Sequence, residues 1–112
     1  MGARTGVDLS KVTSRETAEA LFADGKLEKM LLFPSEFGGK EIPQNIVYVP
    51  LGISAIKGQL TGTLVRMVKD RQINKLTVTP EYKGNSFIPS RITMRAWHTD
   101  QKGEFNPSIE VW

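Results

Sequence analysis

The feature of the sequence that most constrains the fold is one long segment with helical periodicity, residues 52–72. Its apolar residues recur at intervals of three and four, which is typical of a helix that buries one face. The apolar positions are Ile53, Ile56, Leu60, Leu64, Met67 and Val68. The polar face is assigned to Lys57, Arg66, Lys69 and Asp70. We therefore predict one long helix that packs across a sheet.

Shorter segments on both sides of this helix predict the rest of the fold. A short helix is expected over residues 15–23, because Thr13 or Ser14 can cap it and Asp24-Gly25 can end it. Runs with the length and composition of strands are found at residues 27–33, 45–49, 75–82, 87–98 and 108–112. The predicted fold class is α+β, in the order α-β-β-α-β-β-β, with a mostly antiparallel sheet and one long helix packed on it.

The length of 112 residues fits one domain. Residues 1–12 lack periodicity, so we predict a flexible N-terminal lead-in there and a single α+β domain over residues 13–112. No apolar run approaches the roughly 20 residues that span a bilayer, and no secretory h-region is present. The absence of cysteine excludes disulfides, thiolate metal sites and a cysteine nucleophile, and it suits a cytoplasmic protein.

Few residues could carry catalysis. His98 is the single histidine and stands beside Thr99 and Asp100 at the end of a strand, which favours a position in a turn. A Ser-His-Asp arrangement is formally available, but the GxSxG sequence that presents such a serine is missing. The glycine motifs that cradle phosphates are missing as well. We therefore expect a non-enzymatic protein with no catalytic residues, no metal and no cofactor.

The irregular segment over residues 34–45 is a candidate binding loop. Glu36 and Glu41 flank Gly38-Gly39 there, among two prolines. We predict that this loop lies at the surface and that the two glutamates are its polar contacts with a partner. Two carboxylates beside a glycine pair can also carry acid–base chemistry or bind a divalent cation. A solvated loop without a function is the simpler interpretation.

Small residues form a stripe along the predicted long helix. Ser54, Gly58 and Gly62 stand four residues apart, and each glycine costs about 1 kcal/mol relative to alanine within a helix. We favour the interpretation that the stripe lets the helix pack closely against the sheet. A seam between two helices of a dimer is the alternative.

Alternation along residues 87–98 predicts a binding strip. If Ile92 and Met94 face inward, Arg91, Arg95 and Trp97 project together from the opposite face. Arginine and tryptophan are enriched at the centres of protein–protein interfaces, and they can also contact phosphates and stack on bases. A third interpretation is that a second helix covers this face, so that the tryptophan belongs to the core.

The distribution of charge favours an acidic partner. The formal net charge is +3, but residues 57–95 contain eight basic and two acidic residues, whereas residues 1–56 contain six basic and seven acidic ones. The local surplus of six positive charges suits an acidic protein surface or nucleic acid. We predict a protein-binding domain whose partner has an acidic surface. The alternative is a small nucleic-acid-binding domain that uses the basic and aromatic strand face.

The segments LLFPSEFGG, NIVYVPLGI, PEYKGNSFIPSRI and IEVW resemble, in size and layout, small stand-alone bacterial immunity-type proteins. This resemblance implies a protein that neutralises a partner by binding it. Immunity proteins against nucleases are expected to be acidic, and the positive net charge of this chain departs from that pattern. The resemblance assigns no functional residue.

Overall fold

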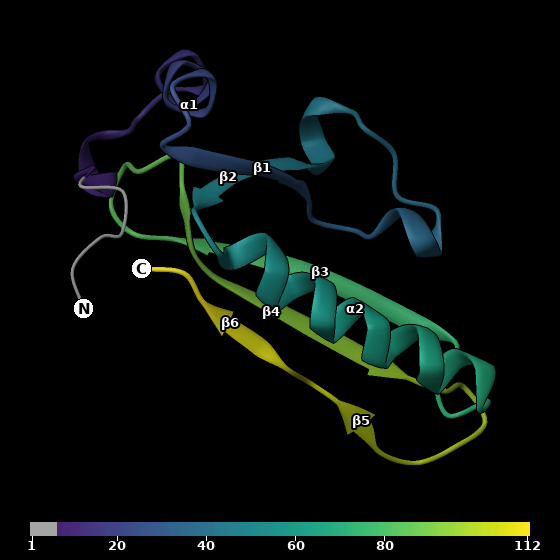
Figure 1. Ribbon diagram of the computed structural model, residues 1–112. Helices are drawn as coiled ribbons and strands as arrows, with labels where there is room; N and C mark the ends of the chain where they lie inside the picture. Colours follow the sequence, from purple (N-terminus) through teal and green to yellow (C-terminus); the bar gives the residue numbers. More distant parts are fainter. Residues whose placement is uncertain (1–6) are drawn as a thin grey trace.

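The computed structural model describes residues 7–112, which form an α+β fold with one long helix packed on a sheet, as predicted (Figure 1). The helices are α1 (Arg15–Ala23) and α2 (Ile53–Lys69). The strands are β1 (Leu27–Leu31), β2 (Ile46–Pro50), β3 (Lys75–Tyr82), β4 (Pro89–Trp97), β5 (Glu104–Phe105) and β6 (Ser108–Glu110). The 3-10 turns of this part of the chain are η1 (Leu9–Lys11), η2 (Ser35–Phe37) and η3 (Pro43–Asn45).

The strands form two sheets, and all pairings within the described residues are antiparallel. In the smaller sheet β1 pairs with β2, so that Leu27 lies opposite Pro50. In the larger sheet β4 is central, with β3 on one side and with β5 and β6 on the other. The short strand β5 lies in a segment predicted to be a turn, which adds one strand to the expected order.

Helix α2 packs along the inner face of the larger sheet (Figure 1). Its fully buried apolar residues are Ile53 and Leu64, which meet the inward side chains of β4. Ile56 and Val68 were predicted to join them, but their exposed fractions are 42% and 43%. Both residues lie at the margins of the buried face, where the sheet does not reach over them.

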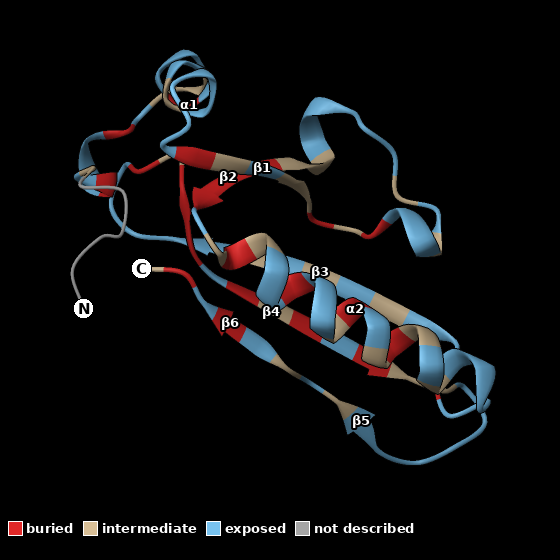
Figure 2. Ribbon diagram, viewed as in Figure 1, coloured by how far each residue is buried: buried red, intermediate tan, exposed pale blue. Residues whose placement is uncertain are grey.

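Two hydrophobic clusters share β2 as a common wall (Figure 2). Val47 and Val49 point into the cluster between α2 and the larger sheet. Tyr48 points to the other side, into a cluster that contains Ala18 of α1 and Leu27 of β1. Because successive residues of a strand point to opposite faces, a strand between two cores must be apolar at every position. This explains the uninterrupted apolar run of β2.

The predicted flexible lead-in over residues 1–12 is wrong for its second half; residues 1–6 lie outside the described residues. Leu9 and Val12 are buried in the cluster on the α1 side. The Ser86 hydroxyl donates to the Leu9 carbonyl at 2.7 Å, and the Phe87 amide donates to the Val12 carbonyl at 2.6 Å. The packed domain therefore begins before residue 13.

The small-residue stripe of α2 does not pack against the sheet, contrary to the interpretation favoured from the sequence. Gly58 and Gly62 are exposed, and a Cβ atom added to either would meet nothing within 4 Å. Ser54 is partly buried at the first turn, and from there the stripe winds away from the core into solvent.

Candidate functional site

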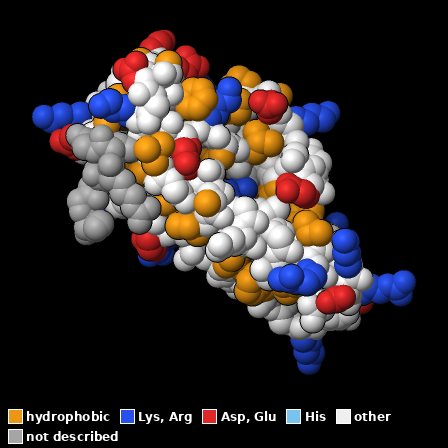
Figure 3. All heavy atoms as spheres, in the orientation of Figure 1, with side chains coloured by type: hydrophobic (Ala, Val, Ile, Leu, Met, Phe, Trp, Pro, Cys, Tyr) orange, Lys and Arg blue, Asp and Glu red, His pale blue; other side chains and the backbone are white. Residues whose placement is uncertain are grey.

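A cleft of about 220 Å³ opens between α2, β1 and the turn η2. One wall is apolar and the other polar, so the cleft can receive a molecule that has both kinds of surface. Its lining consists of Met30, Leu31, Pro34, Ser35, Glu36, Ser54, Lys57, Gly58 and Thr61. Figure 3 looks onto the face that carries α2 and shows a basic side chain set deep between its neighbours.

Lys57 is the buried cation of this cleft, although it was predicted on the polar face of the helix. It follows Ile53 by four residues and precedes Leu64 by seven, so it shares their face, and its exposed fraction is 5%. No side chain or carbonyl of the described residues accepts a hydrogen bond from its ammonium group. Burial lowers the pKa of Lys57, and the negative charge of Glu36 partly offsets this effect.

Glu28 of β1 caps the beginning of α2. The helix begins after Gly52, which offers no side-chain cap. One carboxylate oxygen of Glu28 accepts from the Ser54 amide at 3.0 Å and from the Ser54 hydroxyl at 2.8 Å. Burial alone would raise the pKa of Glu28, but hydrogen bonds from the Ser54 and Gly52 amides and from the Ser54 hydroxyl lower it. One amide of the first turn of α2, that of Ser54, thus already donates to a protein carboxylate.

The loop over residues 34–45 is fixed by its backbone. Gly39 lies so close to the backbone of Phe33, two residues after the end of β1, that an added Cβ would stand 1.9 Å from the Phe33 carbonyl oxygen. The side chain of Asn45 accepts from the Phe33 amide at 2.7 Å and donates to the Phe33 carbonyl at 3.0 Å. Gly38 adopts φ 97°, a left-handed conformation that suits glycine. The glycine pair therefore has a structural role and holds η2 beside the cleft.

Of the two glutamates in this loop, one lines the cleft and the other does not. Glu36 lines the cleft and lies close enough to Lys57 to raise its pKa. Glu41 is exposed and does not line the cleft. Among residues 7–112, no three acidic or histidine side chains are grouped so that they could hold a metal ion. The structure thus brings Glu36 together with Lys57 rather than with Glu41.

The predicted strip lies on the outer face of the larger sheet, opposite α2. Arg91 and Arg95 are exposed on this face, and their side chains have exposed fractions of 47% and 53%. Trp97 is half-buried and belongs to neither hydrophobic cluster. Of the helices in the described chain, none covers this face (Figure 2), so the interpretation of a covering helix is wrong.

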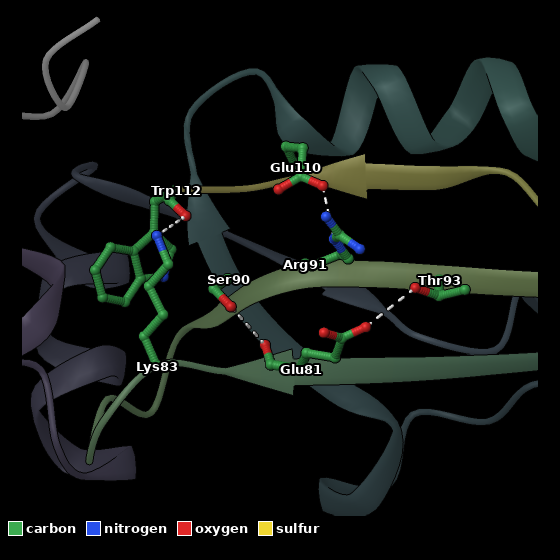
Figure 4. A network of polar contacts seen from close by, with 7 residues as sticks. All are labelled: Glu81, Lys83, Ser90, Arg91, Thr93, Glu110 and Trp112. Atoms are coloured by element: carbon green, nitrogen blue, oxygen red, sulfur yellow. Dashed lines mark hydrogen bonds and ion pairs between the residues drawn. The ribbon is translucent and has the colours of Figure 1, made fainter.

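Each arginine of the strip is neutralised by a neighbouring strand. Arg91 Nε lies 2.6 Å from Glu110 Oε2 of β6, as Figure 4 shows. Arg95 Nε donates to Glu104 of β5 at 2.9 Å, and this contact raises the pKa of Arg95 and lowers that of Glu104. The positive surplus expected here is therefore cancelled by glutamates that lie later in the chain.

The guanidinium of Arg95 also lies over the Trp97 ring, 4.4 Å from its centroid. This cation–π contact holds the exposed guanidinium of Arg95 against the half-buried ring of Trp97. The pair forms a flat, amphipathic patch at one end of the strip. A base could stack on this ring face only after displacing the arginine.

Two other residues singled out from the sequence have local roles. His98 lies in a turn, where its Nδ1 accepts from the Asp100 amide at 3.0 Å. Trp112 packs against both hydrophobic clusters, and its indole Nε1 donates to the Ile88 carbonyl at 3.1 Å. Lys83 donates to the Trp112 carbonyl oxygen at 2.7 Å (Figure 4).

Sequence reasoning missed Lys57 and Glu28 as members of a site. The signal for Lys57 was available, because the spacing from Ile53 to Leu64 places it on the buried face; its charge was taken as sufficient reason to put it outside. Glu28 could not be found in this way, because its partner Ser54 is 26 residues away.

No family model matches this chain, and comparisons with curated proteins and with solved structures found no similar protein. No helix within residues 7–112 is both long enough and apolar enough to cross a membrane. The function must therefore be argued from the two sites themselves.

Proposed function

We propose that this chain is a non-catalytic domain that binds another protein through the outer face of its larger sheet. The observation that supports this proposal most directly is the contact between the exposed Arg95 and the half-buried Trp97 on a sheet face that no described helix covers. Tryptophan and arginine are the residues that most often dominate the energetics of protein interfaces. Ordered side chains also lose less entropy on binding than free ones.

The pairing of charges favours a protein partner over nucleic acid. A strip that binds phosphates needs a surplus of positive charge, but Arg91 and Arg95 are each paired with a glutamate. A protein surface with its own alternating charges can match such a face. To bind this face, the carboxylates of the acidic partner expected from the sequence would have to replace Glu104 and Glu110 as the partners of the two arginines.

The size and composition of the chain support two further parts of the proposal. An immunity-like role, in which binding neutralises the partner, is the specific form that agrees with a small domain of this layout. A cytoplasmic location agrees with a chain of 112 residues that contains no cysteine.

The experiment that tests the proposal places a photo-crosslinking amino acid at Thr77, an exposed position opposite Arg95 on β3. The matched control carries the same amino acid at Gln59, which is exposed on α2. We expect one protein to be crosslinked in cells at Thr77 and not at Gln59. With that protein purified, Trp97→Ala should weaken binding at least about tenfold, as truncation of a central interface residue does.

Three outcomes would contradict the proposal. Crosslinking to nucleic acid at Thr77, with an affinity that falls steeply with salt, would favour the alternative function. Equal crosslinking at Thr77 and Gln59 would indicate non-specific contact. Unchanged affinity in Trp97→Ala would place the interface on another surface.

A further inference from the structure

We propose that the cleft between α2 and β1 is a binding site for a carboxylate group, which Lys57 holds through its ammonium group. The cleft lies on the helix side of the larger sheet, so this inference is independent of partner binding at the outer face. Four observations carry it: the burial of the lysine, its lack of a short-range partner, the engagement of the hydroxyl groups beside it and the two-sided lining.

The first step concerns the hydrogen-bonding capacity of Lys57. Among the described residues, every fully enclosed side-chain nitrogen or oxygen has a hydrogen-bond partner. No described group accepts from the ammonium of Lys57, so this group must face the open cleft rather than closed protein. An ammonium has three donors, and a side chain that is 95% buried can use them only toward what enters the cleft.

The second step shows that the other polar groups around the cleft are engaged. The Thr61 hydroxyl donates to the Lys57 carbonyl at 2.9 Å, and the Ser54 hydroxyl donates to Glu28 at 2.8 Å. Glu28 in turn also accepts from the Ser54 amide at 3.0 Å. Among the described residues that line the cleft, Lys57 is thus the one cation, and it is in neither of the ion pairs of the described chain.

The third step concerns the charge of the ligand. Glu36 lies at the cleft and already opposes the positive charge of Lys57. One ammonium beside this carboxylate can offset a single negative charge better than a double one, which favours a carboxylate over a phosphate dianion.

The fourth step concerns size and shape. A volume of about 220 Å³ is smaller than the clefts that hold drug-sized ligands. Met30, Leu31 and Pro34 supply an apolar wall for a short aliphatic chain. The ligand is therefore a carboxylate on a short apolar stem, either a free small acid or an acidic side chain of a protein.

The test titrates the intact protein with butyrate and follows the backbone amides by NMR. We expect saturable shifts at Ser54, Lys57 and Gly58 with butyrate, and none with butyramide, which has the same shape but no charge. Inorganic phosphate should bind at least about tenfold more weakly than butyrate. Equal shifts with butyrate and butyramide, or tighter binding of phosphate, would overturn the proposal.

A blocked glutamate, N-acetylglutamate amide, separates the two sources of the carboxylate. Binding of butyrate without binding of the blocked glutamate identifies a free small acid. Tighter binding of the blocked glutamate identifies an acidic side chain of a protein. If neither binds, the proposal is wrong.

The matched variants are Lys57→Met and Lys69→Met, of which the second removes an exposed lysine of the same helix. Lys57→Met should lower the affinity for the carboxylate that binds by at least about tenfold, because a charge-assisted hydrogen bond is lost. Lys69→Met should leave it unchanged. An unchanged affinity in folded Lys57→Met would exclude Lys57 as the ligand-binding group.

Discussion

The cleft around Lys57 and the strip on β4 place positive charge in opposite settings. In the strip, two exposed arginines lie against glutamates of adjacent strands. In the cleft, a buried lysine has no ion pair and faces an opening. Exposed pairs contribute little to stability, whereas a buried charge without a partner reduces it. The ion pairs of the strip therefore change the stability of the fold very little, whereas the buried charge in the cleft lowers it.

The largest effect should come from Gly39, which holds the turn η2 beside the cleft. Gly39→Ala places a Cβ 1.9 Å from the Phe33 carbonyl oxygen, and backbone on both sides must move. We expect the free energy of unfolding to fall by about 3 kcal/mol, the upper end of the range for overpacking. Chemical denaturation measures this change.

The matched control for this variant is Gly62→Ala, which meets open space on α2. It should raise the free energy of unfolding by up to about 1 kcal/mol, because alanine favours the helix. Equal stability of Gly39→Ala and the wild-type protein would show that the loop can shift freely and that the cleft has no rigid frame.

The next effect separates the two cations directly. Lys57→Met removes a buried charge and should raise the free energy of unfolding at neutral pH by about 1–2 kcal/mol. Arg91→Met, at an exposed position, should change it by less than about 0.5 kcal/mol. A loss of stability in Lys57→Met would mean that its ammonium makes favourable contacts in the folded protein.

The pH dependence of the same variant gives a second measurement. The pKa of Lys57 is lowered by burial below its ordinary value of 10.5. Between the folded and the unfolded pKa the unfolded chain binds more protons, so the stability of the wild-type protein rises with pH in that window. Lys57→Met should lack this rise in denaturation experiments from neutral to alkaline pH.

A smaller effect is expected from Glu28, which holds the polar wall of the cleft. Glu28→Gln should lower the free energy of unfolding by about 0.5–1 kcal/mol near pH 7, because a negative charge at the N-terminus of α2 is lost. The effect is modest because the carboxylate is partly exposed and water screens its charge. Its folded pKa is lowered, so its contribution is present above the ordinary value of 4.5 and is lost as pH falls through the folded value. Glu41→Gln, at an exposed position of the loop, is the matched control and should change the free energy of unfolding by less than about 0.5 kcal/mol.

The smallest effect should be found in the strip. Arg95→Met removes both the contact with Glu104 and the cation–π contact with Trp97. We expect a slight decrease in the denaturation midpoint at low salt that disappears at high salt, because exposed charges are screened. A large decrease that persists in high salt would mean that the strip is part of the structural core.

The alternation in the sequence predicted which side chains share the outer face of β4, but it did not predict that their charges are paired. Period-two alternation placed Ile92 and Met94 inside and Arg91 and Arg95 outside, because a strand offers only two faces. The neutralising glutamates come from β5 and β6, and their register on β4 depends on long-range pairing that no local pattern encodes. The positive charges of Arg91 and Arg95 are therefore offset on the strip itself.

The cleft was harder to predict because each of its parts breaks a local rule. A lysine at a core position and a helix without its own cap both contradict the usual preferences. The structural role of Gly39 was not predicted, because its close approach to Phe33 can be seen only when the chain is folded. Only the placement of Glu36 in a surface loop followed from the local sequence.

The position of β2 between the two hydrophobic clusters has a consequence for cooperativity. Val47 and Val49 belong to one cluster and Tyr48 to the other, so neither cluster can open while this strand stays in place. Local opening that stops short of global unfolding is therefore confined to segments outside β2, such as the loop that carries Glu41. The amides of β2 should exchange with deuterium only through complete unfolding, which makes the domain one cooperative unit despite its two cores.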